Sequence, residues 1–432
     1  MTFRFSPLRF LRQRFESQRL KQANGIVETA ATASKGWFWT RMHTRQALRG
    51  LRRKGRRTLG IALARLIGPR HYATTLPLDD VATVLICRIN GRIGNTMFLT
   101  PAIRYLHELL PRASIDLVLA HPEAKNLLSA LPGVRRVITF PHKTPQMIGR
   151  YLAALRTMRA CRYDIAIDPI PESTSGRIVL TLCRARYRLG FAGGTQWAPL
   201  THAVPEPPDV GTMHQAVRPV YLLSRIFGAP YESHSVRLWL PLREFEIAAG
   251  RRSIAQVTAS DPSQTNANAF GFFAHAASLK LIDRAWWLAF WEAFLALEPQ
   301  ALPVEFLPSP ERAPVNEDFA CLHVPSLRGL TAAIAATRMF ISTDTGPMHL
   351  ASSTAVPTVA LFHASDPDLF RPLKPTDLAI DIAHSSPRAV AYRCQQIWRA
   401  SRTNAEAVMP TVIRGLSATQ KQDADRGRVS RV

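Results

Sequence analysis

A turn that follows an apolar strand constrains this chain most. The residues from Arg338 to Ser342 read as a strand, and small polar residues lead from it to Gly346 and Pro347. Glycine permits a tight turn, and proline suits the first turn of a helix because its missing N–H would have no partner there. A helical pattern follows from Met348 to Ser353. The stretch predicts a strand–turn–helix unit of an α/β sheet, which presents backbone N–H groups to a phosphate.

Two side chains of this turn, Asp344 and Thr345, stand where they can reach a bound nucleotide-sugar. An ordinary connection between a strand and a helix, without any ligand, would use the same kinds of residue. The apolar run from Val356 to Phe362 predicts the next buried parallel strand. The turn alone therefore leaves a ligand site and a plain connection open.

The segment STDTGPMHLASSTAVPTVALFHASDPDLFRP closely resembles the donor-binding segment of glycosyltransferase family 9, the ADP-heptose:lipopolysaccharide heptosyltransferases. The resemblance includes Val356-Pro357 and Ser365-Asp366-Pro367, and it extends more loosely over about residues 81–400. It implies an α/β fold of GT-B architecture, in which two doubly wound Rossmann-like domains face a central cleft. The donor nucleotide-sugar would then contact Asp344, Thr345, Gly346, Pro347, Met348 and His349.

Apolar strands alternate with helical patterns along most of the chain, which indicates doubly wound domains. We predict a basic N-terminal extension at residues 1–78 and an acceptor-binding domain at 79–232. A nucleotide-sugar-binding domain with a closing helix is predicted at 233–402, and a polar tail at 403–432.

A second motif follows the predicted strand from Val81 to Cys87, in a loop that leads into a helix to about Leu110. It resembles the first motif of the family at Gly94, Thr100, Pro101 and Ala102. The family's aspartate, the usual candidate for its catalytic base, is replaced by Asn95. Asparagine cannot accept a proton at neutral pH, although it can orient a sugar hydroxyl. Three alternatives follow: another acid serves as the base, the reaction is slower, or this branch of the family relies on positioning the reactants.

Two carboxylates are the substitute candidates for the base. Asp168 ends the predicted strand that begins at Tyr163, and Glu172 follows it, so both lie where ligands bind in open α/β sheets. The alternative for each is a helix cap or a loop carboxylate, which is the more common role of such residues at strand–helix junctions. Gly94, Thr96 and Glu172 are predicted to lie in loops that contact the acceptor.

Lys280 lies in a loop between the predicted strand from Phe270 to Ala274 and a tryptophan-rich helix. It resembles the family's phosphate-binding lysine, and Ser278 precedes it in the same loop. Its role would be to neutralise the diphosphate leaving group as negative charge builds. Without the resemblance, Lys280 is a solvated loop lysine.

Two helical patterns predict core faces rather than binding surfaces. The aromatic stripe from Trp286 to Phe294 has helical spacing, which is typical of a buried face. A helix predicted from Thr144 to Ala160 would bury Leu152, Leu155 and Met158.

The sequence indicates no metal site. The five cysteines are scattered without a CxxC pair, which suggests buried thiols in a reducing compartment. Asp366-Pro367-Asp368 is formally a DxD, but we interpret it as a turn and helix cap. The resemblance implies no obligatory metal, because a lysine and helix N–H groups can replace one.

The net charge of +24 is unevenly distributed. Residues 1–70 contain 17 Lys or Arg and two Asp or Glu, a net charge of +15. Such a basic arm favours an anionic surface as partner. We expect the anionic inner leaflet of the cytoplasmic membrane, because no nucleic-acid-binding signature, signal peptide or long apolar run accompanies the charge. Nucleic acid remains the alternative partner of the arm.

The resemblance implies an inverting glycosyltransferase of the hexosyl- or heptosyltransferase type. It would move a sugar, heptose from ADP-heptose, onto a lipopolysaccharide core or related glycolipid. The alternative is a non-catalytic protein of the same fold that binds a nucleotide or glycan without turnover. Asn95 supports this alternative, whereas Lys280 and Asp344 argue against it.

Overall fold

The computed structural model describes residues 76, 80–89, 92–140, 148–171, 173–192, 200–259, 268–276 and 280–408. Glu172, Ser278, the tail beyond residue 408 and almost all of the predicted extension at 1–78 lie outside the described residues. Within the described part, no helix is both long and apolar enough to cross a membrane.

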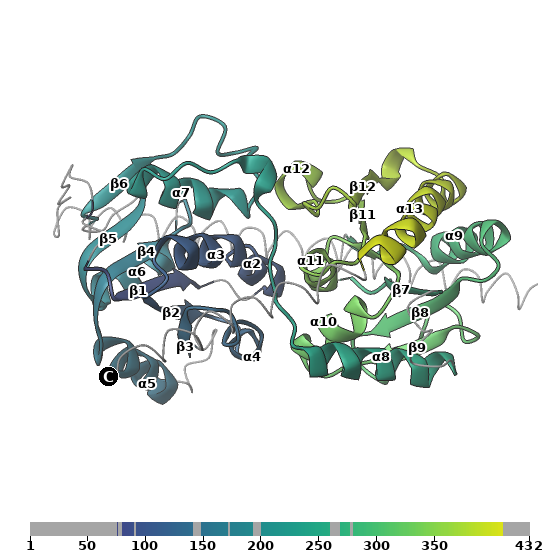
Figure 1. The fold of residues 1–432 in the computed structure, drawn as a ribbon, viewed down its shortest axis with the longest axis horizontal. Coiled ribbons are helices and arrows are strands. Elements are labelled where there is room, and N and C mark those ends of the chain that lie inside the picture. The colour runs from purple at the N-terminus through teal and green to yellow at the C-terminus, as the bar shows by residue number, and fades with distance from the viewer. Residues whose placement is uncertain are drawn as a thin grey trace, which may run out of the picture. The chain divides into compact units, whose positions relative to one another are not determined.

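Two parallel six-stranded sheets form the frame of the protein (Figure 1). The strands of the first sheet lie in the order β3-β2-β1-β4-β5-β6, and those of the second in the order β12-β11-β10-β7-β8-β9. The strands of the first sheet are β1 (Thr83–Arg88), β2 (Ser114–Leu119), β3 (Val134–Thr139), β4 (Arg162–Asp168), β5 (Arg184–Ala192) and β6 (His202–Pro205). Those of the second are β7 (Ala269–Phe273), β8 (Leu302–Leu307), β9 (Ala320–His323), β10 (Met339–Thr343), β11 (Thr358–Phe362) and β12 (Leu378–Asp381).

Both sheets have the doubly wound order, which confirms the predicted α/β class. The order reverses between β1 and β4 in the first sheet and between β7 and β10 in the second. In open sheets of this kind, ligands bind beyond the carboxyl ends of the strands at such a reversal. The two reversals therefore mark where a site is expected.

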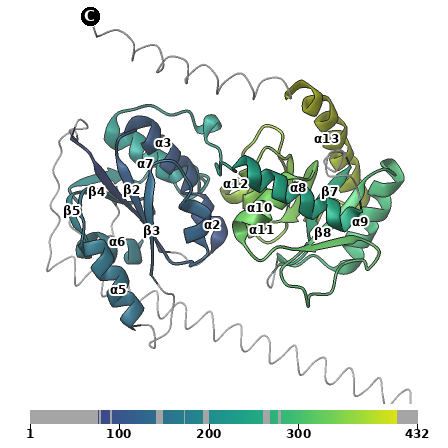
Figure 2. The ribbon, with the colours of Figure 1, turned by 60° about the horizontal axis from the view of Figure 1, so that its bottom comes forward.

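Helices cover both faces of the first sheet (Figure 2). These helices are α2 (Ile93–Met97), α3 (Thr100–Leu109), α4 (Ala124–Leu128), α5 (Ile148–Arg159), α6 (Thr174–Leu182) and α7 (Val217–Phe227). Helices α3, α4 and α7 share one buried cluster, whereas α5 and α6 share another. Figure 2 shows α3 and α7 on one side of the strands and α5 and α6 on the other.

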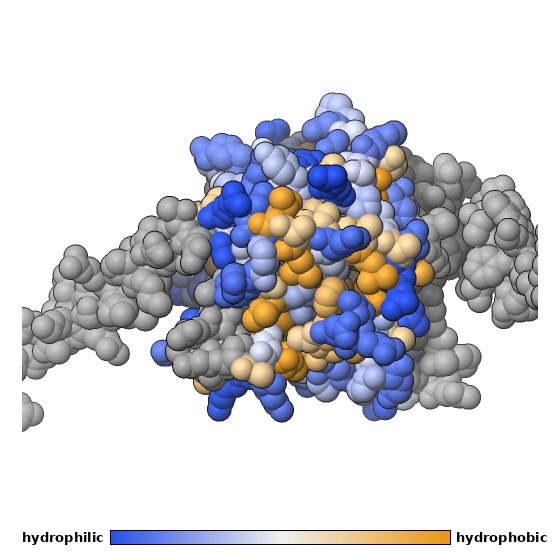
Figure 3. All heavy atoms as spheres, turned by 90° about the vertical axis from the view of Figure 1, so that its right-hand side faces the viewer, coloured by the Kyte–Doolittle hydropathy of each residue, from blue (hydrophilic) through white to orange (hydrophobic). Residues whose placement is uncertain are grey.

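The second sheet is likewise covered on both faces. Its helices are α8 (Glu244–Thr258), α9 (Arg284–Leu297), α10 (Leu327–Ala335), α11 (Gly346–Ser352), α12 (Pro367–Phe370) and α13 (Pro387–Val408). The aromatic stripe of α9 is buried against Phe270 and Phe272 of β7, as predicted, and Trp398 of α13 joins the same cluster. On the face that Figure 3 shows, which includes the α9 and α13 side, apolar residues gather among hydrophilic ones.

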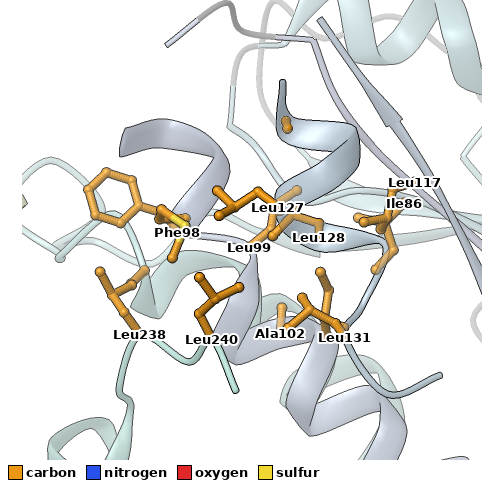
Figure 4. Packing of buried hydrophobic residues seen from close by; sticks show 14 of the residues in the cluster. Ile86, Phe98, Leu99, Ala102, Leu117, Leu127, Leu128, Leu131, Leu238 and Leu240 are labelled. Atoms are coloured by element: carbon orange, nitrogen blue, oxygen red, sulfur yellow. The ribbon is translucent and has the colours of Figure 1, made fainter. Parts of the chain in front are cut away.

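The segment between the sheets is packed into the core of the first sheet (Figure 4). Leu238 and Leu240, which precede α8, lie near Phe98 and Ala102 and belong to the same buried cluster. The N–H of Trp239 donates to the hydroxyl of Thr100 at 2.9 Å. This connection is therefore held by apolar burial and by a hydrogen bond.

The helix predicted up to Leu110 is in fact two helices, α2 and α3, with a break at Phe98 and Leu99. Pro101 has no N–H to donate to the carbonyl oxygen of Met97, four residues earlier. The hydroxyl of Thr100 donates to that oxygen instead, at 2.8 Å. The break therefore follows from the Thr-Pro pair.

Other predictions of elements were wrong or incomplete. In α5, Met158 is buried as predicted and Leu155 is half-buried, but Leu152 is 47% exposed. The four-residue strands β6, β9 and β12 were not predicted. Strands this short at or near a sheet edge give little sequence periodicity.

Candidate functional site

The predicted turn after β10 lies at the carboxyl edge of the second sheet. β10 ends at Thr343, and α11 begins at Gly346. The hydroxyl of Thr345 makes no cap bond to α11, because it lies 3.0 Å from the Ser342 hydroxyl and 3.2 Å from the Thr343 carbonyl oxygen. The first turn of α11, with Pro347 in it, thus has no side-chain cap, and its N–H groups suit an anion.

Asp344 is the centre of a polar group that we call the Asp344 cluster, which also contains Lys280, His349 and Ser365. The ammonium of Lys280 donates to Oδ2 of Asp344 and, at 3.0 Å, to the Asp344 carbonyl oxygen. Ser365 donates to Oδ2 at 2.7 Å, and Nε2 of His349 lies 3.4 Å from Oδ1. The cluster joins the loop after β7, the turn after β10 and the segment after β11 at the reversal of the second sheet.

The carboxylate of Asp344 is strongly held in its ionised form. Burial alone would raise the pKa of Asp344, but the hydrogen bonds and charge of His349 and the hydrogen bonds from Lys280 and Ser365 hold it well below its usual range. The ionised carboxylate fixes the position of the Lys280 ammonium, which also lies 5.9 Å from the centre of the Phe370 ring. A fixed cation at this edge can stabilise phosphate charge.

The prediction that Gly94 and Thr96 lie in a loop was wrong, because both lie with Asn95 in the short helix α2, which packs against α11. A β-carbon at Gly94 would lie 2.4 Å from Cδ2 of His349, a distance that real β-carbons do not reach. Glycine is therefore required at position 94 for this approach. The contact brings the loop after β1 to the Asp344 cluster, with Asn95 half-buried on the same short helix.

Phe98 links two histidines next to this contact. Its ring lies edge-on to His349 at 4.7 Å and to His214 at 5.6 Å between ring centres. Nε2 of His214 lies 2.9 Å from the Arg371 carbonyl oxygen, and Nδ1 accepts the N–H of Ala216 at 3.1 Å. These contacts place the ring proton on Nε2, and burial lowers the pKa of His214 to about 4. His214 is therefore a neutral structural link to the end of α12.

Asp168, one of the two predicted bases, lies at the end of β4 and is completely buried. Its Oδ1 accepts the N–H of Ile170 at 3.4 Å, and its Oδ2 lies 3.7 Å from the Arg177 guanidinium. Burial raises the pKa of Asp168 to about 6, although Arg177 and the hydrogen bond from Ile170 lower it. A β-carbon at Gly176 would lie 2.3 Å from Oδ2, so the carboxylate sits tightly under α6. These contacts favour a structural role, and the catalytic role stays a prediction.

Some residues of the site were not predicted. Ser365 was recognised only as part of a matching motif, although its hydroxyl contacts Asp344. Arg88 ends β1 and is buried, its Nε atom has no hydrogen-bond partner, and its guanidinium lies 5.8 Å from the Phe98 ring centre. Burial lowers the pKa of Arg88 to about 10. The sequence feature that could have pointed to Arg88 is its position as a charged residue at the end of an apolar strand.

The Asp366-Pro367-Asp368 sequence is a turn and a helix cap, as interpreted. Asp366 precedes α12, and its Oδ1 accepts the N–H of Asp368 at 2.9 Å. Among the described residues, no group of three or more His, Cys, Asp or Glu side chains is arranged to hold a metal ion.

Two Rossmann-type sheets in one chain, with turns that meet at the Asp344 cluster, define a protein of GT-B architecture. The chain belongs to glycosyltransferase family 9 (heptosyltransferase), whose family model matches residues 151–395, and it is thus a glycosyltransferase. The match includes the whole Asp344 cluster, whereas Gly94 and Asn95 lie before it.

Solved structures with the same fold have low sequence identity to this chain. A family 9 glycosyltransferase from Veillonella parvula DSM 2008 has a TM-score of 0.61 at 17% identity, over 76% of this chain and 98% of that one. The E. coli heptosyltransferase WaaC with ADP has a TM-score of 0.57 at 20% identity, over 74% of this chain and 99% of that one. The structure of E. coli ADP-heptose lps heptosyltransferase II has a TM-score of 0.56 at 19% identity, over 74% of this chain and 99% of that one. No curated protein sequence matches this chain.

Proposed function

We propose that this protein transfers a heptose from ADP-heptose to a lipopolysaccharide core or related glycolipid, with inversion at the anomeric carbon. The single observation that carries the donor site is the Asp344 cluster, which fixes the Lys280 ammonium beside the uncapped first turn of α11. An ammonium and free helix N–H groups are the partners that a diphosphate needs. The ADP in the E. coli WaaC structure supports an adenine nucleotide as donor.

The reaction follows from this arrangement as a single displacement. The acceptor hydroxyl oxygen forms a bond to the anomeric carbon while the bond from that carbon to the diphosphate oxygen breaks. The leaving diphosphate gains negative charge, which Lys280 and the N–H groups of α11 stabilise without an obligatory metal. Asn95 orients the acceptor hydroxyl through its amide. The proton goes to another base, for which Asp168 and Glu172 are the predicted candidates.

The acceptor and the cellular location are also part of the proposal. A glycolipid acceptor places the enzyme at the inner face of the cytoplasmic membrane, as a peripheral protein. The net charge of +15 on residues 1–70 supports contact with anionic lipid rather than nucleic acid. These residues lie outside the described part of the chain, so the role of the arm stays a prediction.

Calorimetric titration of ADP, UDP and GDP tests the donor site. We expect selective binding of ADP to the wild-type protein and weaker binding to Lys280→Ala, because the mutant loses a phosphate partner. Lys125→Ala, at an exposed position on α4, is the matched control and should bind like the wild type. A preference for UDP or GDP would contradict ADP-heptose as the donor.

A turnover assay separates the enzyme from the non-catalytic alternative that Asn95 suggests. ADP release from ADP-heptose that depends on a lipopolysaccharide acceptor, with an α-to-β or β-to-α change by NMR, would support the transferase. Tight ADP binding without acceptor-dependent release would favour a binding protein.

A further inference from the structure

Helix α5 carries a stripe of apolar side chains, most of which the described residues leave exposed. Ile148, Tyr151 and Leu152 are 63%, 37% and 47% exposed, and Leu155 continues the stripe half-buried. Their spacing of three, four and seven residues from Ile148 places them on one flank of the helix. An exposed stripe of this kind is informative, because apolar side chains on a monomer surface are usually scattered.

The core uses one edge of this stripe, because Met158 follows Tyr151 by seven residues and lies on the same line of the helix. Ala154 and Met158 are the buried residues of α5 and pack into the cluster that covers the first sheet. Helix α6 belongs to the same cluster and adds exposed Ile178 and Leu182. A guanidinium nitrogen of Arg159 in α5 donates to the Leu182 carbonyl oxygen at 3.0 Å, so the two helices are joined. Packing of the first sheet therefore covers one edge of the stripe, where Leu155 packs against the cluster and the Tyr151 ring lies 6.2 Å from that of Phe140. It leaves Ile148 and Leu152 exposed.

Among the described residues of α5, α6 and the strand ends that adjoin them, the exposed charges have a single sign. Helices α5 and α6 contain no Asp or Glu. The nearest described acid along the chain, Asp164, accepts the backbone N–H groups of Ala82 and Thr83 at 3.0 and 2.8 Å and is thus used within the sheet. The exposed charged residues on α5 and at the strand ends next to it and α6 are Arg150, Arg156, Arg159, Arg162, Arg184 and Arg186.

We propose that the α5–α6 face docks onto an anionic lipid leaflet. This face consists of the six arginines above together with Ile148, Tyr151, Leu152 and Leu155 of α5 and Ile178 and Leu182 of α6. Apolar side chains enter the boundary between headgroups and acyl chains, while arginines contact the lipid phosphates. The proposal adds a membrane contact within the described fold and does not depend on which sugar is transferred.

Charge decides between this occupant and two others. A second copy of the chain, seated face to face, would place arginines against arginines. The chain's own residues 1–70, with a net charge of +15, would be repelled in the same way. The apolar residues on the α9 and α13 side (Figure 3) differ, because charges of both signs accompany them: α9 carries Arg284 and Glu292, and Glu298 follows the helix.

Co-sedimentation of the full chain with vesicles tests the proposal. The vesicles contain phosphatidylcholine with or without phosphatidylglycerol. One variant removes apolar contact (Ile148→Ser with Leu152→Ser), and another reverses charge (Arg150→Glu with Arg156→Glu). We expect each to weaken binding to anionic vesicles by about tenfold or more, because the first variant loses apolar contact with the bilayer and the second replaces attraction to lipid phosphates with repulsion. All four positions are exposed, so thermal unfolding should stay unchanged.

Matched controls lie on α8, which has an exposed aromatic residue and exposed arginines. Phe245→Ser and Arg251→Glu with Arg252→Glu should bind vesicles like the wild type. Hydrogen exchange of α5 should slow when anionic vesicles are added to the wild type.

Several outcomes would overturn the proposal. Vesicle binding that the α5 variants leave unchanged would assign the contact to another part of the chain. If the α8 control variants lost as much vesicle binding as the α5 variants, binding would depend on the net charge of the protein and not on the α5–α6 face. Loss of oligonucleotide binding at matched salt, with vesicle binding intact, would make the face a nucleic-acid site. A dimer in solution that Leu152→Ser dissociates would make it an interface between copies.

Discussion

Gly94 and His349 approach each other so closely that a β-carbon at Gly94 would lie 2.4 Å from Cδ2 of the His349 ring. The two residues are far apart in sequence and belong to α2 and α11, which follow the first strand of one sheet and a central strand of the other. The same His349 ring faces Asp344 through Nε2. A change at Gly94 therefore reaches the Asp344 cluster through a single side chain.

Gly94→Ala should impair the enzyme more than its fold. The new methyl group must displace the His349 ring, at a cost of about 1–3 kcal/mol for overpacking. Moving the ring also disturbs Asp344, so we expect weaker ADP binding by calorimetry. Gly149→Ala is the control, because no atom lies within 4 Å of a β-carbon at this position of α5. That variant should be neutral or slightly more stable, since alanine favours a helix over glycine. Equal ADP affinity in Gly94→Ala and the wild type would contradict the coupling.

Ser365→Ala should lower stability through Asp344. The Ser365 hydroxyl donates to Oδ2 at 2.7 Å, and hydrogen bonds to charged groups contribute about 1.5–3 kcal/mol. Denaturant unfolding at neutral pH measures the loss. Ser253→Ala, on α8, removes a hydroxyl that contacts only the carbonyl oxygen of Ala249 in its own helix. We expect Ser253→Ala to change the free energy of unfolding by less than about 0.5 kcal/mol. If it lost as much stability as Ser365→Ala, the hydrogen bond from Ser365 to Asp344 would have no special role.

His214 should make the protein sensitive to acid. Its pKa is about 4 in the folded protein against 6.5 as its ordinary value. The unfolded chain therefore binds a proton first, and stability falls as the pH drops from about 6.5 to 4, by about 3 kcal/mol in total. His214→Asn should flatten this part of the curve, because it no longer titrates while its Oδ1 can still accept the Ala216 N–H. Denaturant unfolding of both proteins at several pH values between 4 and 7 measures the difference, and equal slopes would contradict this role of His214.

The local chemistry of the sequence was enough to predict the turn from Asp344 to Gly346. A strand end, a glycine and a helix-starting proline are consecutive in the chain, so their geometry follows from neighbours. Lys280 was predicted through the family resemblance. The contacts of Gly94 with His349 and of Ser365 with Asp344 were not, because each depends on how two distant segments pack.

Helix α5 shows why a periodic pattern can assign the wrong face. Leu152, Leu155 and Met158 have helical spacing, but they lie across one broad apolar stripe, and periodicity does not say which edge of the stripe meets the sheet. The structure buries Ala154 and Met158 and exposes Leu152. Alanine gave little signal because it is common in helices for reasons of propensity alone.

Asp168→Asn distinguishes a buried structural carboxylate from a catalytic base. The folded pKa of Asp168 is about 6, above its ordinary value of 3.8, so ionisation costs the folded state on the order of 3 kcal/mol, a cost that develops as the pH rises from about 4 to 6. Asparagine resembles the protonated acid in shape. We therefore expect the variant to keep or raise stability at pH 7 and to lose this pH dependence.

The turnover of Asp168→Asn distinguishes a structural from a catalytic role of Asp168. Because Asp168 is completely buried against Gly176 and Arg177, we expect turnover to stay within about tenfold of the wild type. General-base catalysis contributes about 10²- to 10⁴-fold, so a loss of that size in a variant that is still folded and still binds ADP would identify Asp168 as the base. The pH–rate profile is an independent check. If Asp168 is the base, activity in the wild type should rise with a midpoint near pH 6, where its carboxyl loses the proton, and Asp168→Asn should abolish that rise. If Asp168 is structural, both proteins should share one profile, and the proton of the acceptor hydroxyl must leave by another group.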